Sequence, residues 1–475
     1  MSLFDLDFGS GFRHGVHPPD LKDLTSGEAI RRMPFPDRIV LPLQQHAGAP
    51  ARLLVGRGDR VQRGDRVGEA QGFISSPIHA SAAGTVRDVR RWPHPDGTMK
   101  EAVVIDVDPH SPQVPRPRIV PEWEGLEAGE VAGAVRDAGV VGLGGAAFPA
   151  HVKLSPPEGA EIDTVVANGA ECEPYLTGDH RTMVEHPERV HFGLRVMMHA
   201  LGVERAVIGV EENKPDAIAE LRRTAPDDLD ITVASLRAKY PQGAEKMMIK
   251  SILGREVPSG GLPLDVGVVV QNVGSISTIA QVFETGYPLV ERTVTVTGPG
   301  IRRPSNLTVP VGTLLADVLE FCGGMTEDAE RVVFGGPMMG NAQPDLNTPL
   351  LKGTTGVVVL TEAAAAGGRQ YPCIRCGRCL EACPVFLDPA DLGQLARAGR
   401  WEEMTDLDLN DCMLCGSCAY VCPSNIPLTQ LIATGKSQVR RLRHLAEEKE
   451  EGADESEEAD GADGSGDESP EKDAA

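Results

Sequence analysis

The chain has few aromatic residues, no long apolar run and no excess of basic residues. Aromatic residues make up only 4% of its 475 residues. No stretch reaches the roughly 18 apolar residues that a bilayer-spanning helix needs, so we expect no membrane span. Lysine and arginine number 46 against 69 aspartates and glutamates, which gives a net charge of −23. This sign is wrong for a protein that binds the phosphates of a nucleic acid.

A secretory signal is also missing from the sequence. The first residues, MSLFDLDFGSGFRHGVHPPD, lack the basic flank and the continuous apolar core of such a signal. We therefore expect a cytoplasmic protein in a reducing compartment. There, ten cysteines are better explained as metal ligands than as disulfides.

Glycine and proline are abundant, with 53 and 37 residues, which indicates many tight turns. The negative charge is concentrated in residues 446–475, which contain 14 acidic residues, two lysines and almost no apolar side chain. Such a segment cannot repay the entropy of ordering, so we predict a disordered acidic tail. For the basic stretch within residues 435–449, contact with anionic lipid or a partner and a solvated helix face are both open.

The rest of the chain predicts four successive domains after an N-terminal arm of residues 1–29. Residues 30–115 contain short strands broken by turns, typical of a small β-barrel or sandwich. Over residues 120–290, apolar strands alternate with helices, which predicts a parallel sheet covered on both faces. Residues 291–362 return to strands with one helix, and residues 363–435 carry two cysteine runs on short helices. The predicted fold class is therefore multidomain α/β plus β.

Eight of the ten cysteines fall in two runs of identical spacing, Cys-x2-Cys-x2-Cys-x3-Cys-Pro. In bacterial ferredoxins, three thiolates of such a run bind one [4Fe–4S] cluster and the fourth binds the neighbouring cluster. We therefore assign the ligands of two clusters in crossed sets. The first set is Cys373, Cys376, Cys379 and Cys422, and the second is Cys412, Cys415, Cys418 and Cys383.

Structural zinc is the alternative interpretation of these runs. Zinc sites usually use two Cys-x2-Cys pairs and do not need a third thiolate three residues further on, so clusters are favoured. The two other cysteines have simpler explanations. Cys322 is predicted to be a small buried apolar residue, and Cys172 to fill a small position in a loop.

Four loops of the α/β region have the composition of a flavin site. The loop 139–154, GVVGLGGAAFPAHVKL, offers glycine N–H groups and Lys153 to a phosphate, although a glycine cluster alone is often only a tight turn. The loops 165–174 and 268–275 each follow a strand and carry amide side chains, which suit a flavin edge and a ribityl chain. The fourth loop is 239–246, KYPQGAEK. Because parallel sheets bind ligands at the carboxyl ends of their strands, we expect the chemistry there.

These motifs resemble those of known proteins. The loops resemble those of the flavin-bearing NADH-dehydrogenase subunit of respiratory complex I. Over about residues 10–430 the chain resembles the RnfC family, which provides the C subunits of Rnf complexes, the ion-pumping ferredoxin:NAD oxidoreductases. The matching motifs are GVHPPD, LPLQQHAGAP, ISSPIHASAAGTV, GLGGAAFPAHVKL, NGAECEPY, KYPQGAEK, GREVPSGGLPLDVGVVVQNVG and both cysteine runs. The resemblance implies a barrel-sandwich hybrid domain, a Rossmann-like FMN/NADH domain, a β-grasp domain of the soluble-ligand-binding (SLBB) type and a ferredoxin-like domain.

The resemblance also implies which residues bind the cofactors. The loop that cradles the FMN phosphate corresponds to Gly142, Gly144, Gly145 and Lys153. Other flavin-pocket residues correspond to Asn168, Glu171, Gly243, Glu245, Gln271 and Asn272. Phe148 matches an aromatic residue that stacks on the NADH adenine, and Glu173 matches a carboxylate near the dinucleotide. The chain departs from complex I at Ala147, Ala170 and Ala244, where complex I has glycine, aspartate and glutamate.

Such a protein is expected to pass electrons between NAD(H), which gives two as a hydride, and [4Fe–4S] clusters, which pass one at a time. Non-covalent FMN would convert between the two, so no catalytic side chain is expected. The resemblance implies a peripheral subunit on the cytoplasmic face of the membrane, with membrane-embedded and iron–sulfur Rnf subunits as partners and a ferredoxin-side carrier reached indirectly. Two alternatives stay open: a flavin/iron–sulfur corrin reductase, and a scaffold in which only the clusters work.

Overall fold

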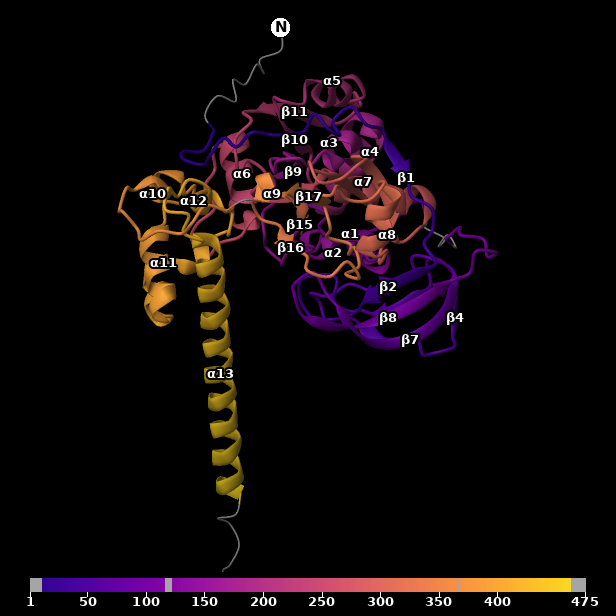
Figure 1. The fold of residues 1–475 in the computed structure, drawn as a ribbon. Helices are drawn as coiled ribbons and strands as arrows, with labels where there is room; N and C mark the ends of the chain where they lie inside the picture. Colours follow the sequence, from indigo (N-terminus) through magenta and orange to yellow (C-terminus); the bar gives the residue numbers. More distant parts are fainter. Residues whose placement is uncertain (1–10, 116–121, 366, 463–475) are drawn as a thin grey trace, which may run out of the picture. The chain divides into compact units, whose positions relative to one another are not determined.

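The computed structural model describes residues 11–115, 122–365 and 367–462. The chain divides into two compact units, Met1–Gly368 and Arg369–Ala475, whose elements are labelled in Figure 1. Each unit has its own hydrophobic core.

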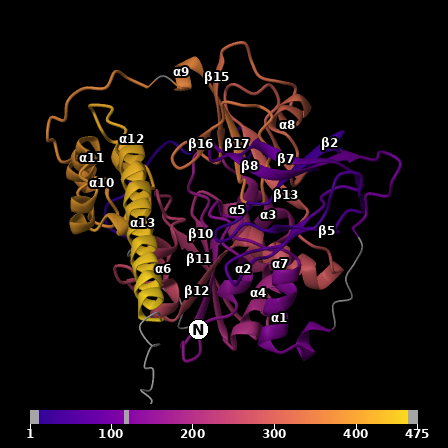
Figure 2. The same ribbon diagram turned by 90° about the horizontal axis from the view of Figure 1, so that it is seen from below.

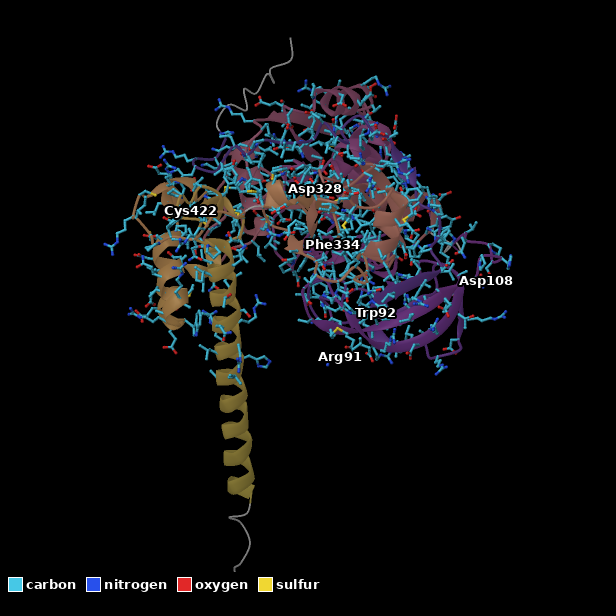
Figure 3. The ribbon with its side chains drawn as sticks, viewed as in Figure 1. Arg91, Trp92, Asp108, Asp328, Phe334 and Cys422 are labelled. Carbon is cyan, nitrogen blue, oxygen red and sulfur yellow. The ribbon has the colours of Figure 1, made fainter. Side chains whose placement is uncertain are left out.

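Two small antiparallel sheets form the first domain of the larger unit, with strand orders β2-β8-β7-β4 and β3-β5-β6. The strands are β2 (Arg38–Pro42), β3 (Arg52–Leu53), β4 (Arg60–Val61), β5 (Arg66–Glu69), β6 (Ile78–His79), β7 (Gly84–Pro93) and β8 (Met99–Val107). Alternate residues such as Val103 and Ile105 fill a core between them. Trp92, labelled in Figure 3, donates its Nε1–H to the Asn347 carbonyl at 2.8 Å and so connects this domain to the third.

A four-stranded parallel sheet of order β11-β10-β9-β12 forms the second domain. Its strands are β9 (Thr164–Gly169), β10 (Arg205–Glu211), β11 (Asp230–Leu236) and β12 (Val268–Asn272). Its helices are α1 (Ala128–Asp137), α2 (Ala150–Lys153), α3 (Gly178–Glu185), α4 (Pro187–Leu201), α5 (Pro215–Arg223), α6 (Glu245–Leu253) and α7 (Val273–Thr285), with 3-10 turns at Trp123–Gly125 and Pro263–Val266.

Side chains of this sheet alternate between two faces. Val165 and Ala167 pack with α1, α4 and α7, whereas Val166 packs with α6 on the other face. Figure 2 shows α6 on one side of the strands and α1, α4 and α7 on the other. The predicted parallel sheet with helices on both faces is confirmed.

The third domain is a mixed sheet of order β1-β14-β13-β17-β15-β16 with α8 (Leu315–Phe321) against it. The strands are β1 (Ile30–Arg32), β13 (Glu291–Thr297), β14 (Ser305–Pro310), β15 (Ala329–Phe334), β16 (Asn341–Ala342) and β17 (Gly356–Thr361), and α9 (Glu362–Ala365) follows. Residues 30–32, at the start of the segment predicted to form the barrel, pair in parallel with β14. The reason is that β14 offers an open sheet edge, and that Met33 is buried in the core beneath it.

The second unit is helical, with α10 (Arg378–Ala382), α11 (Pro389–Ala398), α12 (Ser417–Tyr420) and α13 (Leu428–Ala462), and 3-10 turns at Glu402–Leu407 and Leu409–Asp411. Leu392, Met404 and Ile432 lie in its core. Helix α13 continues through residues 446–462, the first part of the acidic tail. Alanine and glutamate, which dominate this stretch, are strong helix formers. Residues 463–475 lie outside the described residues. Of the helices described, none combines the length and apolarity that would take it across a membrane.

Candidate functional site

The parallel sheet brings the predicted flavin loops to one edge. Strands β9 and β12 are paired neighbours, with Asn168 opposite Asn272 at their carboxyl ends. The strand order changes direction between these two strands, because β10 and β11 extend the sheet away from β12. Open parallel sheets bind ligands at such a switch point.

The glycine loop is closed upon itself and open to solvent at its tip. The Gly142 N–H donates to the Phe148 carbonyl at 2.7 Å, and Phe148 is half-buried. Gly144 faces Asn272, since a Cβ on Gly144 would lie 3.5 Å from that side chain. Gly145 has φ +108° and open space where a Cβ would be. The loop can therefore admit a phosphate close to its backbone.

Lys153 lies at the end of α2 and reaches the neighbouring loops. Its Nζ forms an ion pair with Glu245, at the start of α6, and donates to the Val270 carbonyl at 2.9 Å. Two residues predicted from separate loops are thus in contact. A phosphate bound here would compete with the Glu245 carboxylate for the Lys153 ammonium group.

The loop after β9 is joined to the loop before α6. Asn168 donates from Nδ2 to the Gly243 carbonyl at 2.8 Å, and its Oδ1 accepts the Ala170 N–H at 3.1 Å. The Gly243 N–H donates to the Cys172 Sγ at 3.3 Å. Burial raises the pKa of Cys172, so its side chain stays a neutral thiol at pH 7.

Gln271 is only 2% exposed, and its Nε2 has no hydrogen-bond partner among the residues that the structure describes. Buried amide groups are nearly always paired. The orphaned donor therefore fits an acceptor supplied from outside the chain, such as a carbonyl on a flavin edge. Together with the open glycine loop, this donor makes the residues present compatible with FMN.

The two glutamates after β9 already accept hydrogen bonds from the protein. Glu171 accepts the N–H groups of Asp179 and His180 at 3.0 and 3.2 Å, at the start of α3. Glu173, predicted to lie near the dinucleotide, accepts those of Met338 and Met339 at 3.0 and 2.8 Å. Burial raises the pKa of Glu173 to about 7. Glu173 thus connects the second domain to the loop between β15 and β16.

Two residues of this site were missed from the sequence. Asp179 accepts a hydrogen bond from the Asn272 Nδ2 at 2.6 Å, and Arg292 donates from Nη2 to the Leu143 carbonyl at 2.5 Å. Asp179 lies in the first turn of α3, where an acidic residue is ordinary and gives no signal. Arg292 comes from β13 of the next domain, so no local pattern connects it with the glycine loop.

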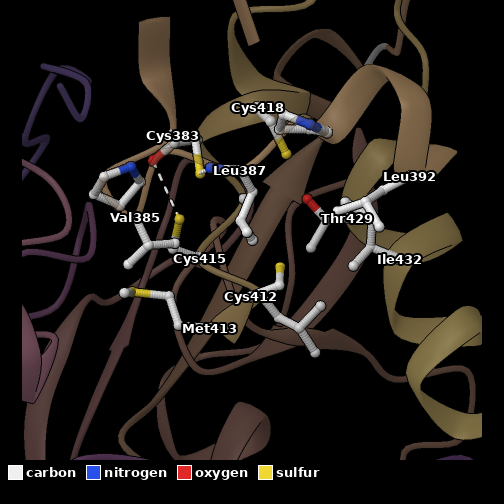
Figure 4. Close-up of a pocket in the computed structure, with 15 residues that line it drawn as sticks. Cys383, Val385, Leu387, Leu392, Cys412, Met413, Cys415, Cys418, Thr429 and Ile432 are labelled. Carbon is white, nitrogen blue, oxygen red and sulfur yellow. Dashed lines mark hydrogen bonds between the residues drawn. The ribbon is translucent and has the colours of Figure 1, made fainter. Parts of the chain in front are cut away.

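In the second unit, four cysteines line one apolar pocket (Figure 4). They are Cys383, Cys412, Cys415 and Cys418, the second of the predicted ligand sets. Leu387, Leu392 and Ile432 line the same pocket. Burial, and then the neighbouring Cys415, raise the pKa of Cys418 to about 12. Sulfurs that surround a cavity inside an apolar shell fit a cluster bound through several irons.

The other four cysteines are more accessible. Cys373 and Cys376 are exposed, whereas Cys379 and Cys422 are half-buried. The Cys373 Sγ accepts the Arg375 N–H at 3.4 Å. Cys379 lies on α10, which packs against α12. Cys422, labelled in Figure 3, lies two residues after the end of α12.

Four known families match successive parts of the chain. The RnfC barrel sandwich hybrid domain matches residues 10–110, and the Nuo51 FMN-binding domain matches residues 135–281. The SLBB domain matches residues 293–342, and a 4Fe-4S dicluster domain matches residues 369–426. The last match favours clusters over zinc at the two cysteine runs.

Three similar whole proteins are C subunits of ion-translocating complexes. The chain is 44% identical over 392 residues to that of the proton-translocating ferredoxin:NAD(+) oxidoreductase complex of Clostridium ljungdahlii, covering 82% of this chain and 86% of that protein. It is 42% identical to that of the Na(+)-translocating complex of Acetobacterium woodii, with 82% and 88% covered. That of the ion-translocating oxidoreductase complex of Rhodobacter capsulatus is 41% identical over 437 residues, with 91% and 84% covered.

Proposed function

The chain belongs to the RnfC family, the C subunits of ion-translocating ferredoxin:NAD(+) oxidoreductase complexes, and on that premise we propose that it exchanges electrons between NAD(H) and two [4Fe–4S] clusters through FMN. The observation that carries the proposal is that flavin-type loops meet at the switch point of the sheet in a chain that also holds eight cysteines in two matched runs. FMN, when bound, supplies the conversion between hydride and single-electron transfer.

The chain's own residues bind and orient the flavin. Gly142, Gly144 and Gly145 let backbone N–H groups approach the phosphate, and Lys153 neutralises part of its charge. The Gln271 Nε2, which has no hydrogen-bond partner among the described residues, would donate to the flavin edge. The remaining residues of the proposed flavin site support its loops; they are Asn168, Glu171, Gly243, Glu245 and Asn272.

The dinucleotide site is assigned to Phe148 and Glu173. Phe148, half-buried at the end of the glycine loop, offers a ring face to an adenine. Glu173 is held by two backbone N–H groups, which fix its carboxylate beside the flavin loops.

The eight cysteines ligate the two clusters in the crossed sets. The pocket that gathers Cys383 with Cys412, Cys415 and Cys418 supports this assignment, because Cys383 belongs to the other run. Apolar side chains around these sulfurs exclude water, which is one of the factors that set a cluster's reduction potential.

The protein functions as one subunit of a larger complex. Peripheral attachment at the cytoplasmic face of the membrane follows from this role, with membrane-embedded subunits translocating the ion and a ferredoxin-side carrier reached through iron–sulfur subunits. The relatives found are subunits of ferredoxin:NAD(+) oxidoreductases, which favours this role over a corrin reductase.

Anaerobic purification of the full chain tests the proposal. We expect FMN and about eight irons per chain, and bleaching of the visible absorption when NADH is added. A chain that keeps its iron but does not respond to NADH would support the scaffold alternative. A chain that holds no flavin after native purification and does not take up added FMN would contradict the proposal.

A further inference from the structure

Asn272 is held in one orientation by three hydrogen bonds. Its Oδ1 accepts the N–H groups of Gly274 and Ser275 at 2.9 and 3.3 Å, which caps the start of α7. Its Nδ2 donates to the Asp179 Oδ2 at 2.6 Å. Because both ends of the amide are engaged, its direction at the carboxyl end of β12 depends on the Asp179 carboxyl group.

The start of α3 connects the same carboxyl group to the loop after β9. Glu171 accepts the backbone N–H of Asp179 at 3.0 Å and that of His180 at 3.2 Å. Movement of Asp179 would therefore disturb two of the predicted flavin loops together, one through Glu171 and one through Asn272.

Arg292 joins the glycine loop to this arrangement. Its guanidinium group is buried and donates to the carbonyls of Leu143 and Thr354. It also attracts Asp179 electrostatically, and a Cβ on Gly274 would lie close to both side chains, 3.2 Å from the Asp179 Oδ1 and 3.5 Å from the Arg292 Nη1. The two charged groups thus both lie beside the start of α7.

We infer that Asp179 is a positioning residue of the flavin site, whose carboxylate orients the Asn272 amide and, with Arg292, holds the three loops around the flavin in register. This inference rests on the proposed binding of FMN. Asp179 acts through Asn272 and the loops, and it is assigned no contact with the flavin.

Ionisation of Asp179 is expected to matter for this role. Burial and the nearby Glu171 carboxylate raise the pKa of Asp179 to about 7, against the attraction of Arg292 and Lys214 and the hydrogen bond from Asn272. Below pH 7 the neutral acid predominates, and the charge-assisted hydrogen bond becomes an ordinary one. Above pH 7 the carboxylate holds Asn272 and Arg292 more strongly.

The test compares FMN affinity of the full, cluster-loaded chain at pH 6 and pH 8, for the wild type and for Asp179→Asn. The variant has the same size and can still accept the Asn272 N–H, but it carries no charge at either pH. We expect equal affinities at pH 6 and about tenfold weaker binding by the variant at pH 8, the factor expected when a charge-assisted hydrogen bond becomes neutral. The phosphate of FMN titrates in the same way with both proteins. The ratio of the two FMN affinities at each pH therefore reports the ionisation of Asp179 alone.

The matched control is Asp216→Asn. Asp216 lies on α5 and accepts a hydrogen bond at 2.8 Å from His180, which is on the same helix as Asp179. Among the interactions of the described residues, none joins the Asp216 side chain to a flavin loop. Its affinity for FMN should follow the wild type within about twofold at both pH values. A second arm leaves Asp179 unchanged and removes the Glu173 carboxyl group, whose pKa also lies at about 7. In Glu173→Gln, the affinity for riboflavin, which has no phosphate, should fall about tenfold from pH 8 to pH 6.

The outcomes separate the two proposals. If the wild type binds FMN and Asp179→Asn matches it at pH 8, the positioning role is overturned while the proposed function stands. A pH-independent affinity of Glu173→Gln for riboflavin overturns the positioning role even if Asp179→Asn fails to fold. If the wild type binds no flavin at all, the proposed function fails and the inference fails with it.

Discussion

The two cysteine runs share a backbone feature but have different surroundings. In each, a glycine in the left-handed region starts a short helix, Gly377 with φ 77° before α10 and Gly416 with φ 85° before α12. Yet Cys415 is 8% exposed and lines the apolar pocket, while Cys376, its counterpart, is exposed. Spacing therefore fixes the local shape of a cluster loop, and the residues packed around that loop decide how far water can reach it.

Apolar neighbours from distant parts of the unit explain this difference. The pocket of the second run is completed by Leu392 on α11 and Ile432 on α13, both buried in the core. Around the first run, Ile374 is 68% exposed and Tyr371 is 52% exposed. We therefore expect the pocket cluster to be the better shielded of the two, and the following experiments examine that difference.

The largest effect is expected from the removal of one ligand in each run. Both Cys415→Ser and Cys376→Ser should lower the iron content from about eight to about four per chain. Cys415→Ser should in addition lose about 2 kcal/mol more of unfolding free energy, because it leaves an emptied apolar pocket with a buried hydroxyl group. Iron analysis and denaturant unfolding measure both effects.

Cys322→Ser is the control for these ligand variants, because Cys322 is a buried cysteine outside both runs. It should keep all its iron. Equal stabilities of the two ligand variants would show that the burial difference has no energetic consequence.

Thiol reactivity in the cluster-free chain should separate the two runs next. Burial, and then Cys415, raise the pKa of Cys418 to about 12, so only about one in 10,000 of its thiols is ionised at pH 8. Cys373 and Cys376 are exposed. We expect iodoacetamide, followed by mass spectrometry, to modify them at least about a hundredfold faster than Cys418.

The pH dependence provides the check on this prediction. Because pH 8 and pH 9 both lie below the raised pKa of Cys418, its modification rate should rise about tenfold between them. Equal rates for all the thiols would mean that the pocket opens when the clusters are absent.

Local patterns were sufficient to predict much of this protein. The cysteine spacing predicted that Cys383 joins the other run, and the pocket places it with Cys412, Cys415 and Cys418. The alternation of apolar strands and helices predicted the parallel sheet, because strands buried on both faces leave a clear signal.

Features that depend on distant residues could not be predicted. Arg292 reaches the glycine loop from the next domain, and Ile30 pairs with Asn306, far along the chain. The Gln271 Nε2, which lacks a partner among the described residues, also has no sequence signal, because its burial results from the packing of the whole sheet. The unequal burial of the two cysteine runs belongs to the same class.

Two leucines, one near each cysteine run, extend the comparison to the unfolding free energy. Leu392 is 0% exposed in the pocket wall, whereas Leu380, on α10 after the third cysteine of the first run, is 39% exposed. Leu392→Ala should lower the unfolding free energy of this unit by about 2–4 kcal/mol, and Leu380→Ala by less than about 1 kcal/mol. Denaturant unfolding of the cluster-loaded chain measures both. A similar loss in both variants would mean that the surface around Leu380 is covered in the assembled protein.

The smallest effect is expected from the two glycines that start α10 and α12. An alanine with positive φ costs about 1 kcal/mol of unfolding free energy. Because both glycines have positive φ, Gly377→Ala and Gly416→Ala should both show this backbone cost. A Cβ on Gly377 would meet nothing within 4 Å, so its variant should show the backbone cost alone. Gly416 is buried in the pocket wall, so a methyl group there would be crowded. Gly416→Ala should therefore lose about 1 kcal/mol more of unfolding free energy than Gly377→Ala. Denaturant midpoints of the two variants give the difference directly. If the two losses are equal, the pocket has room for a methyl group, and the shielding of the second cluster is looser than its lining residues indicate.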